Sequence, residues 1–411
     1  MNELRFKDAT GRDFPEWEVV ELEKIALKVN KKNKDLSLNN VLTNSATQGI
    51  VSQSDYFERD IANQNNLGGY YVVQTDDFVY NPRISANALV GPIKRNNLNT
   101  GVMSPLYTVF RFNEGDLDFF EQYFQTNHWH DYMKSVSNSG ARHDRMNITN
   151  ESFLGLPLPY PSKPEQTKIA NFLTVVDEKT TQLTQKCDLL AQYKKGVMQQ
   201  IFTQELRFED DGGQDFPEWE DKSLSDVGKS FNGLVGKSGD DFGSGQSYIT
   251  YKQIFDSSKI DVNKFSFVEI GENEKQNKVT FGDVFFTTSS ETPNEVGFCS
   301  VLLSEVNDVY LNSFCFGYRI NSFEILSPLF AQFLFHSSGF RENVIKLAQG
   351  STRYNISKVS FMETRVQLPC IHEQTKIANF LTAIDDKITA TQTQLQAVKQ
   401  YKQGLLQQMF V

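Results

Sequence analysis

A long segment of this chain occurs twice. Residues 165–202, EQTKIANFLTVVDEKTTQLTQKCDLLAQYKKGVMQQIF, match residues 373–410, EQTKIANFLTAIDDKITATQTQLQAVKQYKQGLLQQMF, at 20 of 38 positions without a gap. A second pair precedes them, because ELRFKDATGRDFPEWE from Glu3 matches ELRFEDDGGQDFPEWE from Glu205. Self-similarity of this kind indicates one structural module that is used twice.

The segments between the repeats differ from each other. Residues 19–160 and 221–368 share little beyond a closing stretch. Both carry runs of β-branched and aromatic residues, such as YYVVQ near Tyr70 and LNSFCFGYRI near Leu311, which are typical of strands. We therefore expect each insert to be a mixed α and β domain of one common fold. The recurring residues of the closing stretch are Gly140, Arg142, Asn147, Ile148 and Phe153 in the first copy and Gly350, Arg353, Asn355, Ile356 and Phe361 in the second.

The repeated segments predict two long helices. Apolar residues recur at alternating spacings of four and three, which is the pattern of a coiled-coil seam, and antiparallel packing of the two seams is expected. Lys194 and Lys402 interrupt both seams, and Ser162 with Glu165 matches a capping box at the first helix start. The seam residues are Ile169, Leu173, Val176, Leu183 and Leu190 in the first helix and Ile377, Leu381, Ile384, Leu395 and Val398 in the second.

Composition bounds the class of protein. A chain of 411 residues with 39% hydrophobic residues predicts at least two globular domains. Four scattered cysteines without paired spacing favour a reducing compartment, and the absence of a long apolar run predicts a cytoplasmic protein without a membrane segment. The net charge of −10 argues mildly against a nucleic-acid-binding chain, since phosphate contacts usually leave a basic footprint.

The order of these features resembles that of the specificity subunits of type I restriction-modification systems. The resemblance covers the whole chain and rests on the FPEWE openings, the variable inserts and the EQTKIANFLT helix starts at Glu165 and Glu373. It implies that each insert is a target-recognition domain for one half of a split DNA sequence. It further implies that the helices set the gap between the halves and bind two methyltransferase subunits, beside restriction and translocase subunits.

The expected architecture is therefore α+β. It has two mixed α/β target-recognition domains joined by two long helices that form an antiparallel coiled coil with a pseudo-twofold internal repeat. The expected division is residues 1–161, 162–203, 204–369 and 370–411, with the helices as the second and fourth parts. No catalysis and no cofactor are expected on this chain, so S-adenosylmethionine, ATP and magnesium would belong to partner subunits.

Candidate contacts to double-stranded DNA are cations, amides and hydroxyls in loops, because phosphates need positive charge and base edges need hydrogen-bonding groups. The candidates include a run of lysines near residue 31, and such runs are also common on solvated surfaces that bind no ligand. The arginines near residues 142 and 353 are favoured because they recur in both inserts. In the first insert the candidates are Lys31, Lys32, Lys34, Gln48, Ser52, Arg83, Asn87, Lys94, Arg95, Arg142, His143 and Arg145. In the second insert they are Lys237, Ser238, Tyr248, Tyr251, Lys252, Ser351, Thr352, Arg353 and Tyr354.

Two other classes of function compete with DNA recognition. A coiled-coil adaptor that binds proteins without DNA selectivity agrees with the acidic net charge. A hydrolase is a weaker alternative, since His128 and His130 lack a third metal ligand at a diagnostic spacing and no H-E-x-x-H motif is present. Asn81-Pro82-Arg83 is only a partial match to the N-P-P-[YF] tetrapeptide of adenine methyltransferases, and no phosphate loop is present.

Overall fold

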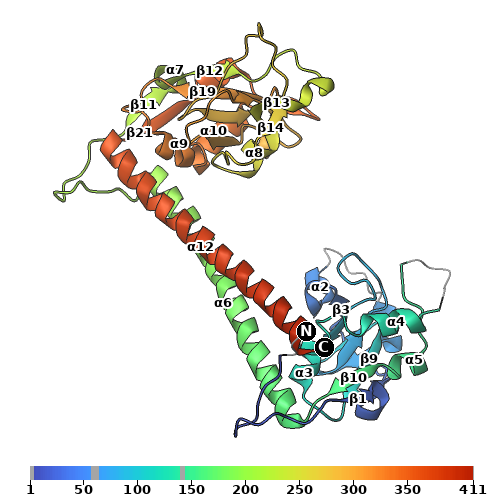
Figure 1. Cartoon of the computed structure of the whole chain (residues 1–411). Helices are drawn as coiled ribbons and strands as arrows, with labels where there is room; N and C mark the ends of the chain where they lie inside the picture. The colour runs from blue at the N-terminus through green and yellow to red at the C-terminus, as the bar shows by residue number, and fades with distance from the viewer. Residues whose placement is uncertain (1–3, 57–63, 139–143, 411) are drawn as a thin grey trace. The chain divides into compact units, whose positions relative to one another are not determined.

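The computed structural model describes residues 4–56, 64–138 and 144–410. The chain forms two compact units, Met1–Thr184 with Thr393–Val411 and Gln185–Gln392. Each unit holds one mixed α/β domain together with one half of each long helix (Figure 1). The four-part division expected from the sequence stays a prediction.

The repeated segments form the two long helices, α6 (Lys163–Phe202) and α12 (Ile371–Met409). Within each unit they lie side by side and are joined by an ion pair, Asp177 with Lys402 in the first unit and Lys194 with Asp385 in the second. From the first ion pair to the second, the residue number rises from 177 to 194 along α6 and falls from 402 to 385 along α12. The two helices therefore run antiparallel, as the sequence predicts. Seam residues Ile169, Leu173, Val176, Leu183, Ile377, Leu381 and Ile384 are buried, whereas Leu190, Leu395 and Val398 are half-buried.

The first domain is built on a four-stranded antiparallel sheet with the order β2-β9-β6-β7. Strand β1 pairs with β10 and so brings the two ends of the domain together. The elements are β1 Glu18–Glu21, α1 Leu22–Ile25, β2 Ala26–Val29, β3 Leu42–Ser45, β4 Gly49–Ser52, α2 Gln53–Tyr56, η1 Gln64–Gly69, β5 Tyr71–Val73, β6 Phe78–Tyr80, β7 Ile93–Arg95, β8 Gly101–Met103, β9 Thr108–Phe112, α3 Leu117–Tyr123, α4 His130–Val136, α5 Asn150–Leu154 and β10 Pro157–Tyr160.

The second domain repeats this plan, with the sheet order β12-β19-β15-β17 and with β11 paired to β21. Its second sheet, β14-β13-β18, differs from the small β3-β4 and β5-β8 pairs of the first domain. The elements are β11 Glu220–Ser223, α7 Leu224–Val227, β12 Gly228–Asn232, η2 Gly239–Asp241, β13 Phe242–Ile249, α8 Tyr251–Asp256, β14 Ser266–Val268, β15 Val284–Thr287, β16 Ser289–Ser290, η3 Pro293–Glu295, β17 Cys299–Val301, β18 Tyr310–Leu311, β19 Cys315–Ile320, α9 Pro328–Leu334, α10 Ser338–Lys346, β20 Tyr354–Asn355, α11 Lys358–Met362 and β21 Arg365–Leu368.

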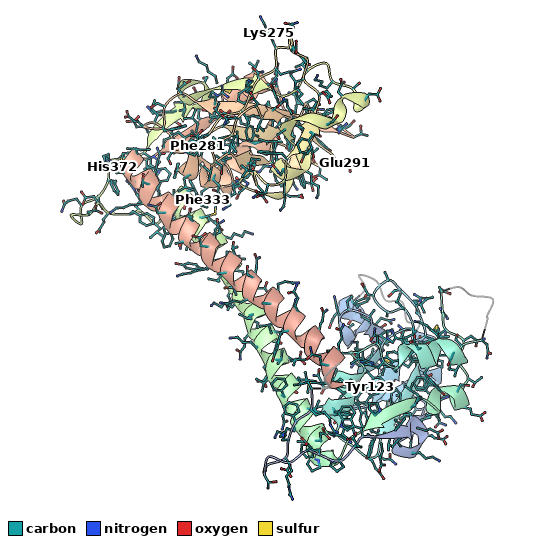
Figure 2. All side chains as sticks on the ribbon, in the orientation of Figure 1. Tyr123, Lys275, Phe281, Glu291, Phe333 and His372 are labelled. Carbon is teal, nitrogen blue, oxygen red and sulfur yellow. The ribbon has the colours of Figure 1, made fainter. Side chains whose placement is uncertain are left out.

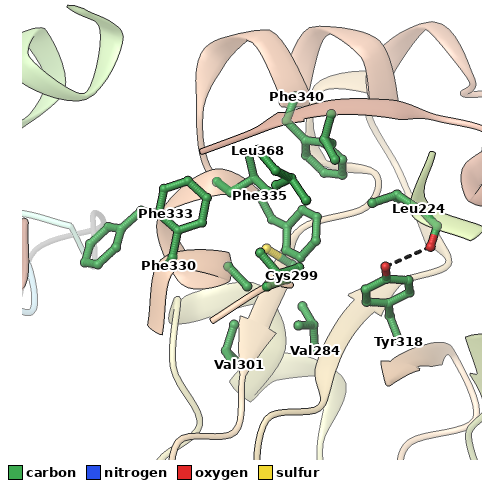
Figure 3. Close-up of a cluster of buried hydrophobic side chains, with 14 of the residues drawn as sticks. Leu224, Val284, Cys299, Val301, Tyr318, Phe330, Phe333, Phe335, Phe340 and Leu368 are labelled. Carbon is green, nitrogen blue, oxygen red and sulfur yellow. Dashed lines mark hydrogen bonds between the residues drawn. The ribbon is translucent and has the colours of Figure 1, made fainter. Parts of the chain in front are cut away.

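The common fold of the two inserts is confirmed by the equal order of the sheets. A buried aspartate just before the central strand binds an arginine of its neighbour in both, as Asp77 with Arg111 and Asp283 with Arg319. The cores are dominated by aromatic and aliphatic side chains, whose burial is the main stabilising term. In the second domain Tyr318 Oη donates to Leu224 O at 2.8 Å, which satisfies its hydroxyl inside the core (Figure 3).

The segment that precedes each domain contacts the first turn of the long helix that follows that domain. Arg5 reaches Glu165 Oε2 at 3.1 Å, and in the second copy Arg207 reaches Glu373 Oε2 at 2.9 Å while Trp219 Nε1 donates to the same atom. Both glutamates are fully buried. The capping box expected at Ser162 is therefore wrong: among the described residues Ser162 Oγ has no partner, and Glu165 is used by Arg5 instead. No helix in the described part of the chain is long and apolar enough to cross a membrane.

Candidate nucleic-acid interface

The structure brings two predicted arginines together in the first domain. The chain leaving strand β6 forms a backbone bridge between Arg83 and Arg145, held by Met146 N donating to Pro82 O at 2.9 Å. Arg83 is exposed and Arg145 is half-buried, and the single carboxylate within 4 Å of Arg145 among the described residues is that of Asp144. Both residues of the bridge are cationic, so a ligand that contacts this part of the surface is expected to be an anion or to carry acceptor atoms. This geometry suits a phosphate or a base edge with acceptor atoms.

The hairpin of β3 and β4 is anchored beside this arginine pair. Buried Asn44 donates to Val79 O at 2.8 Å, and Asn81, next but one to Arg83, donates to Asn44 O at 3.0 Å. Gln48 lies at the exposed tip of the hairpin, and its side-chain amide has no hydrogen bond to another described residue. Ser52 lies at the other end of β4, and its hydroxyl is bonded to Ser54.

The second domain has its predicted residues at the corresponding place. The chain leaving β15 forms β16, which pairs with β20 so that Ser290 faces Tyr354. Tyr251 Oη donates to Ser289 O at 2.9 Å, and burial raises the pKa of this tyrosine above its ordinary value. Arg353 lies over the ring of Phe314 at 5.9 Å. Tyr251, Arg353 and Tyr354 thus converge, although the sequence scatters them over about a hundred positions.

The structure changes which arginines correspond in the two copies. Arg145 stands two residues before Asn147, as Arg353 stands two residues before Asn355, whereas Arg142 has no such match. Asn138 N donates to Asn147 O and Gln349 N donates to Asn355 O, which supports this alignment. The recurrence therefore favours Arg145 as the counterpart of Arg353, while the pairing of Arg142 with Arg353 stays a prediction. Arg142 and His143 themselves lie outside the described residues.

Several candidate cations are already neutralised by carboxylates. Arg95 binds Asp76 and Asp118, both at 2.5 Å, and also approaches Glu121. The side chain of Lys237 is only 7% exposed and lies 2.5 Å from Glu274. The bond from Lys237 and those from Gln276 and Gly271 lower the pKa of Glu274 to about 2. These cations therefore have less charge to offer to phosphate than Arg83, Arg145 or Arg353.

Some of the remaining candidates make local side-chain contacts, whereas others are exposed on surface loops. Ser238 closes the turn of η2 through Asp241, Lys252 pairs with Asp256 at 2.5 Å, and the Tyr248 ring packs on Phe242. Buried Asn33 binds Leu38 on both sides of its amide and so orders the loop with the lysine run. Six exposed candidates form no side-chain hydrogen bond or ion pair with another described residue: Lys31, Lys32, Lys34, Asn87, Ser351 and Thr352.

Sequence reasoning missed Phe314. Its side chain is 56% exposed beside Arg353, and an exposed aromatic ring next to an arginine is a common feature of binding surfaces. The residue lies just before strand β19 in the run LNSFCFGYRI, where strict alternation would place it on the same face as buried Phe316 and Tyr318, so the residue pattern does not reveal its exposure.

The described residues contain no group of three histidine, cysteine or acidic side chains arranged to hold a metal ion. Among the described residues, Cys299 Sγ lies 3.5 Å from His336 Nδ1 in the core of the second domain. Burial raises the pKa of the Cys299 thiol to about 12 and lowers the pKa of His336, so both groups stay neutral. This arrangement does not activate a nucleophile.

Comparison with known proteins identifies relatives of the whole chain. The family model described as "Type I restriction modification DNA specificity domain" matches residues 15–190 and again residues 217–400. The S subunit of the type I restriction-modification system from M. genitalium superimposes with a TM-score of 0.56 at 13% identity, covering 100% of this chain and 99% of that one. A structure described as showing complex assembly and conformational transition of the type I R-M system gives 0.56 at 15% identity, covering 97% and 98%. At these identities the structural likeness concerns the fold.

Proposed function

This chain belongs to the type I restriction modification DNA specificity family, and from this premise we propose that each of its domains reads one half of a bipartite DNA site. The observation that carries the proposal is a cluster of cationic side chains beside the central strand of each domain, which aromatic side chains join in the second domain. Arg83 and Arg145 form it in the first domain, and Tyr251, Arg353 and Phe314 form it in the second. One place in a common fold thus presents different side chains, as two different half-sites require.

The long helices would set the gap between the half-sites. At about 1.5 Å per residue, the 40 residues of α6 span about 60 Å, whereas half-sites one turn apart are separated by about 34 Å. The apolar seam that packs the two helices along their length would give this spacer its stiffness. The repeated helix surfaces would bind two methyltransferase subunits, and restriction and translocase subunits would join that complex. Catalysis, with S-adenosylmethionine, ATP and magnesium, would belong to these partners.

Mapping methylated adenines tests this proposal. The chain is co-expressed with the methyltransferase subunit of its system, and host DNA is sequenced for modified bases. A split motif with a constant gap is the expected result. Insertion of one heptad into α6 and one into α12 should lengthen the gap while leaving both half-motifs unchanged. A stable complex without any methylated motif would contradict DNA reading, and an unchanged gap would contradict the spacer role.

A protein-binding adaptor remains the second candidate, because the net charge of −10 disfavours a chain that binds DNA alone. The two functions differ in their response to salt. DNA recognition by the assembled complex should weaken steeply as salt rises, because phosphate contacts release counterions. An adaptor would bind its protein partners without any sequence preference for DNA.

A further inference from the structure

The two domains carry side chains of opposite charge on one equivalent loop. In the first domain residues 81–92 join β6 to β7, and in the second domain residues 288–298 join β15 to β17. The first loop contains Arg83 and no aspartate or glutamate, whereas the second contains Glu291 and Glu295 and no lysine or arginine. Both loops pair with the closing stretch of their own domain, so they occupy the same place in the common fold.

Glu295 lies in the cluster of side chains that forms the proposed reading site of the second domain. Buried Ser290 donates a hydrogen bond from Oγ to Glu295 Oε2 at 3.0 Å, and the same serine faces Tyr354 across the pair of β16 and β20. Burial raises the pKa of the Tyr251 hydroxyl, the negative charge of Glu295 raises it further, and the positive charge of Arg353 lowers it. Both charges therefore act on one hydroxyl of the cluster.

The backbone on both sides of Glu295 is held by one arginine of α10. Arg341 donates to three carbonyl oxygens of the loop at 2.7–2.9 Å, those of Asn294, Val296 and Gly297. A side chain on a backbone that is already fixed loses less freedom when it binds a ligand. The loop therefore presents the Glu295 carboxylate in a preorganised position.

The Glu295 carboxylate keeps acceptor positions for a ligand. An ionised carboxylate has two oxygens with about four lone-pair sites, and the Ser290 hydroxyl occupies one of these sites. Among the described residues no lysine or arginine forms an ion pair with Glu295, and its side chain is only half-buried. Because a carboxylate repels phosphate and cannot donate, its partner in a DNA complex has to be a hydrogen-bond donor.

The donors that bases present in the major groove are the amino groups of cytosine N4 and adenine N6. Adenine presents the acceptor N7 beside its amino group, and a carboxylate repels that atom. Cytosine presents its amino group without such an acceptor, and its guanine partner presents the two acceptors that an arginine reads. A cluster that contains Glu295 and Arg353 thus suits the two bases of a C·G pair.

We propose that Glu295 selects a cytosine in the half-site of the second domain by accepting a hydrogen bond from its N4 amino group. The inference rests on the proposed function and deepens it, because it names one residue that determines specificity and the base that this residue selects. Arg83 stands at the same place in the first domain and would contact acceptor atoms instead. Opposite charges at one place in a common fold then explain how the two domains read unlike half-sites.

The test replaces the carboxylate of Glu295 by an amide of almost the same shape. Glu295→Gln keeps an acceptor for the Ser290 hydroxyl but adds an amino group, a combination that matches adenine N7 and N6. Glu291→Gln is the matched control, because Glu291 lies on the surface of the same loop, has no hydrogen bond to another described residue and loses the same charge (Figure 2). Each full-length variant is co-expressed with the methyltransferase subunit, methylated motifs in host DNA are mapped, and Kd values are measured for oligonucleotides with each base pair substituted.

We expect Glu295→Gln to reduce the preference for C·G at one base pair of one half-motif by at least about tenfold, with A·T newly accepted there. The other half-motif and the gap should stay unchanged, and the altered half should be the one that Arg353→Ala also weakens. Glu291→Gln should leave the whole motif unchanged. Ser290→Ala removes the bond that orients the carboxylate, so it should weaken discrimination at the same base pair, and it decides the matter if Glu295→Gln does not fold.

An unchanged motif in the Glu295 and Ser290 variants, or one common change in the Glu295 and Glu291 variants, would overturn the inference while the proposed function stands. A higher affinity of Glu295→Gln for every oligonucleotide alike would also overturn it, since the carboxylate would then only repel phosphates. Loss of a bound subunit with an unchanged motif would overturn it as well, because Glu295 would then contact protein. The absence of any methylated motif with the unaltered chain would instead contradict the proposed function.

Discussion

Lys194 and Asp385 join the two long helices, with 2.6 Å between Nζ and Oδ1, and Lys402 and Asp177 repeat the contact at 2.6 Å in the other unit. The sequence pattern places both lysines on the apolar seam, where an unpaired ammonium would be costly. The structure shows why they are tolerated: each finds a carboxylate on the opposite helix.

These pairs should contribute modestly to stability. Their side chains keep 12–39% of their exposure, so solvent screens the attraction. A double-mutant cycle with Lys194→Ala and Asp385→Ala should give a coupling free energy of about 0.5–1 kcal/mol, measured by urea unfolding. The cycle with Lys402→Ala and Asp177→Ala should give a similar value, and a clear difference between the cycles would contradict their equivalence.

The buried Glu373 at the start of α12 should contribute more to the free energy of unfolding than these ion pairs do. Glu373 is fully buried and accepts hydrogen bonds from Arg207 and Trp219, so Glu373→Gln leaves a guanidinium without its main counter-charge. We expect a loss of about 2–3 kcal/mol in the free energy of unfolding, less than for a fully buried pair because Arg207 is 22% exposed.

Glu218 provides the control for this change. It lies 3.7 Å from the same arginine but is 92% exposed, so Glu218→Gln should change stability by less than about 0.5 kcal/mol. Similar losses from both variants in a thermal unfolding experiment would show that burial does not decide the strength of these contacts.

The stability of the loop that contains Lys237 should decrease at acid pH. Bonds from Lys237, Gln276 and Gly271 lower the pKa of Glu274 from 4.5 to about 2 in the folded chain. A carboxyl with a depressed folded pKa stabilises the fold above its unfolded pKa, and this contribution is lost as the pH falls from about 4.5 towards 2. NMR titration should place the midpoint of Glu274 near 2, and Lys237→Ala should move it upward. An unmoved midpoint in that variant would remove Lys237 as the main cause.

Arg145 and Arg353 should act on different half-sites. Replacing Arg353 by Ala should weaken recognition of one half-site by about 1–3 kcal/mol if the guanidinium reads a base, and Arg145→Ala should do the same for the other half. Binding of the assembled complex to oligonucleotides with each half altered in turn measures the effect. Arg12→Ala is a charge-matched control, because Arg12 is exposed and paired with Asp8 outside both clusters. An equal loss of affinity for every oligonucleotide, whatever its sequence, would show that these arginines contact phosphates and do not read bases.

The helices and the repeat could be predicted from residue spacing alone. Ile169, Leu173, Ile377 and Leu381 follow a period that only a helix with one buried face satisfies, and the structure buries all four. The common fold of the inserts was also predictable from the residues around Phe153 and Phe361. Periodicity is a local property of the sequence, so it predicts a helix even when the surface against which the helix packs is unknown.

The binding clusters could be predicted only in part. Arg83, Arg145 and Arg353 have side chains of the right type in loops, which the sequence shows. Arg95 has the same type and is nevertheless held by Asp76 and Asp118, which are 19 and 23 residues away. Whether a cation is free depends on which carboxylates fold against it.

By itself the sequence determined the twofold repeat, the helical pair and the membership of a family of DNA-reading chains, because these depend on spacing and on identity between copies. Tertiary structure decided which arginines stand together and which glutamates are buried. The physical reason is that charge pairing and burial act between residues distant in the chain, such as Arg207 and Glu373, whose proximity is set by folding.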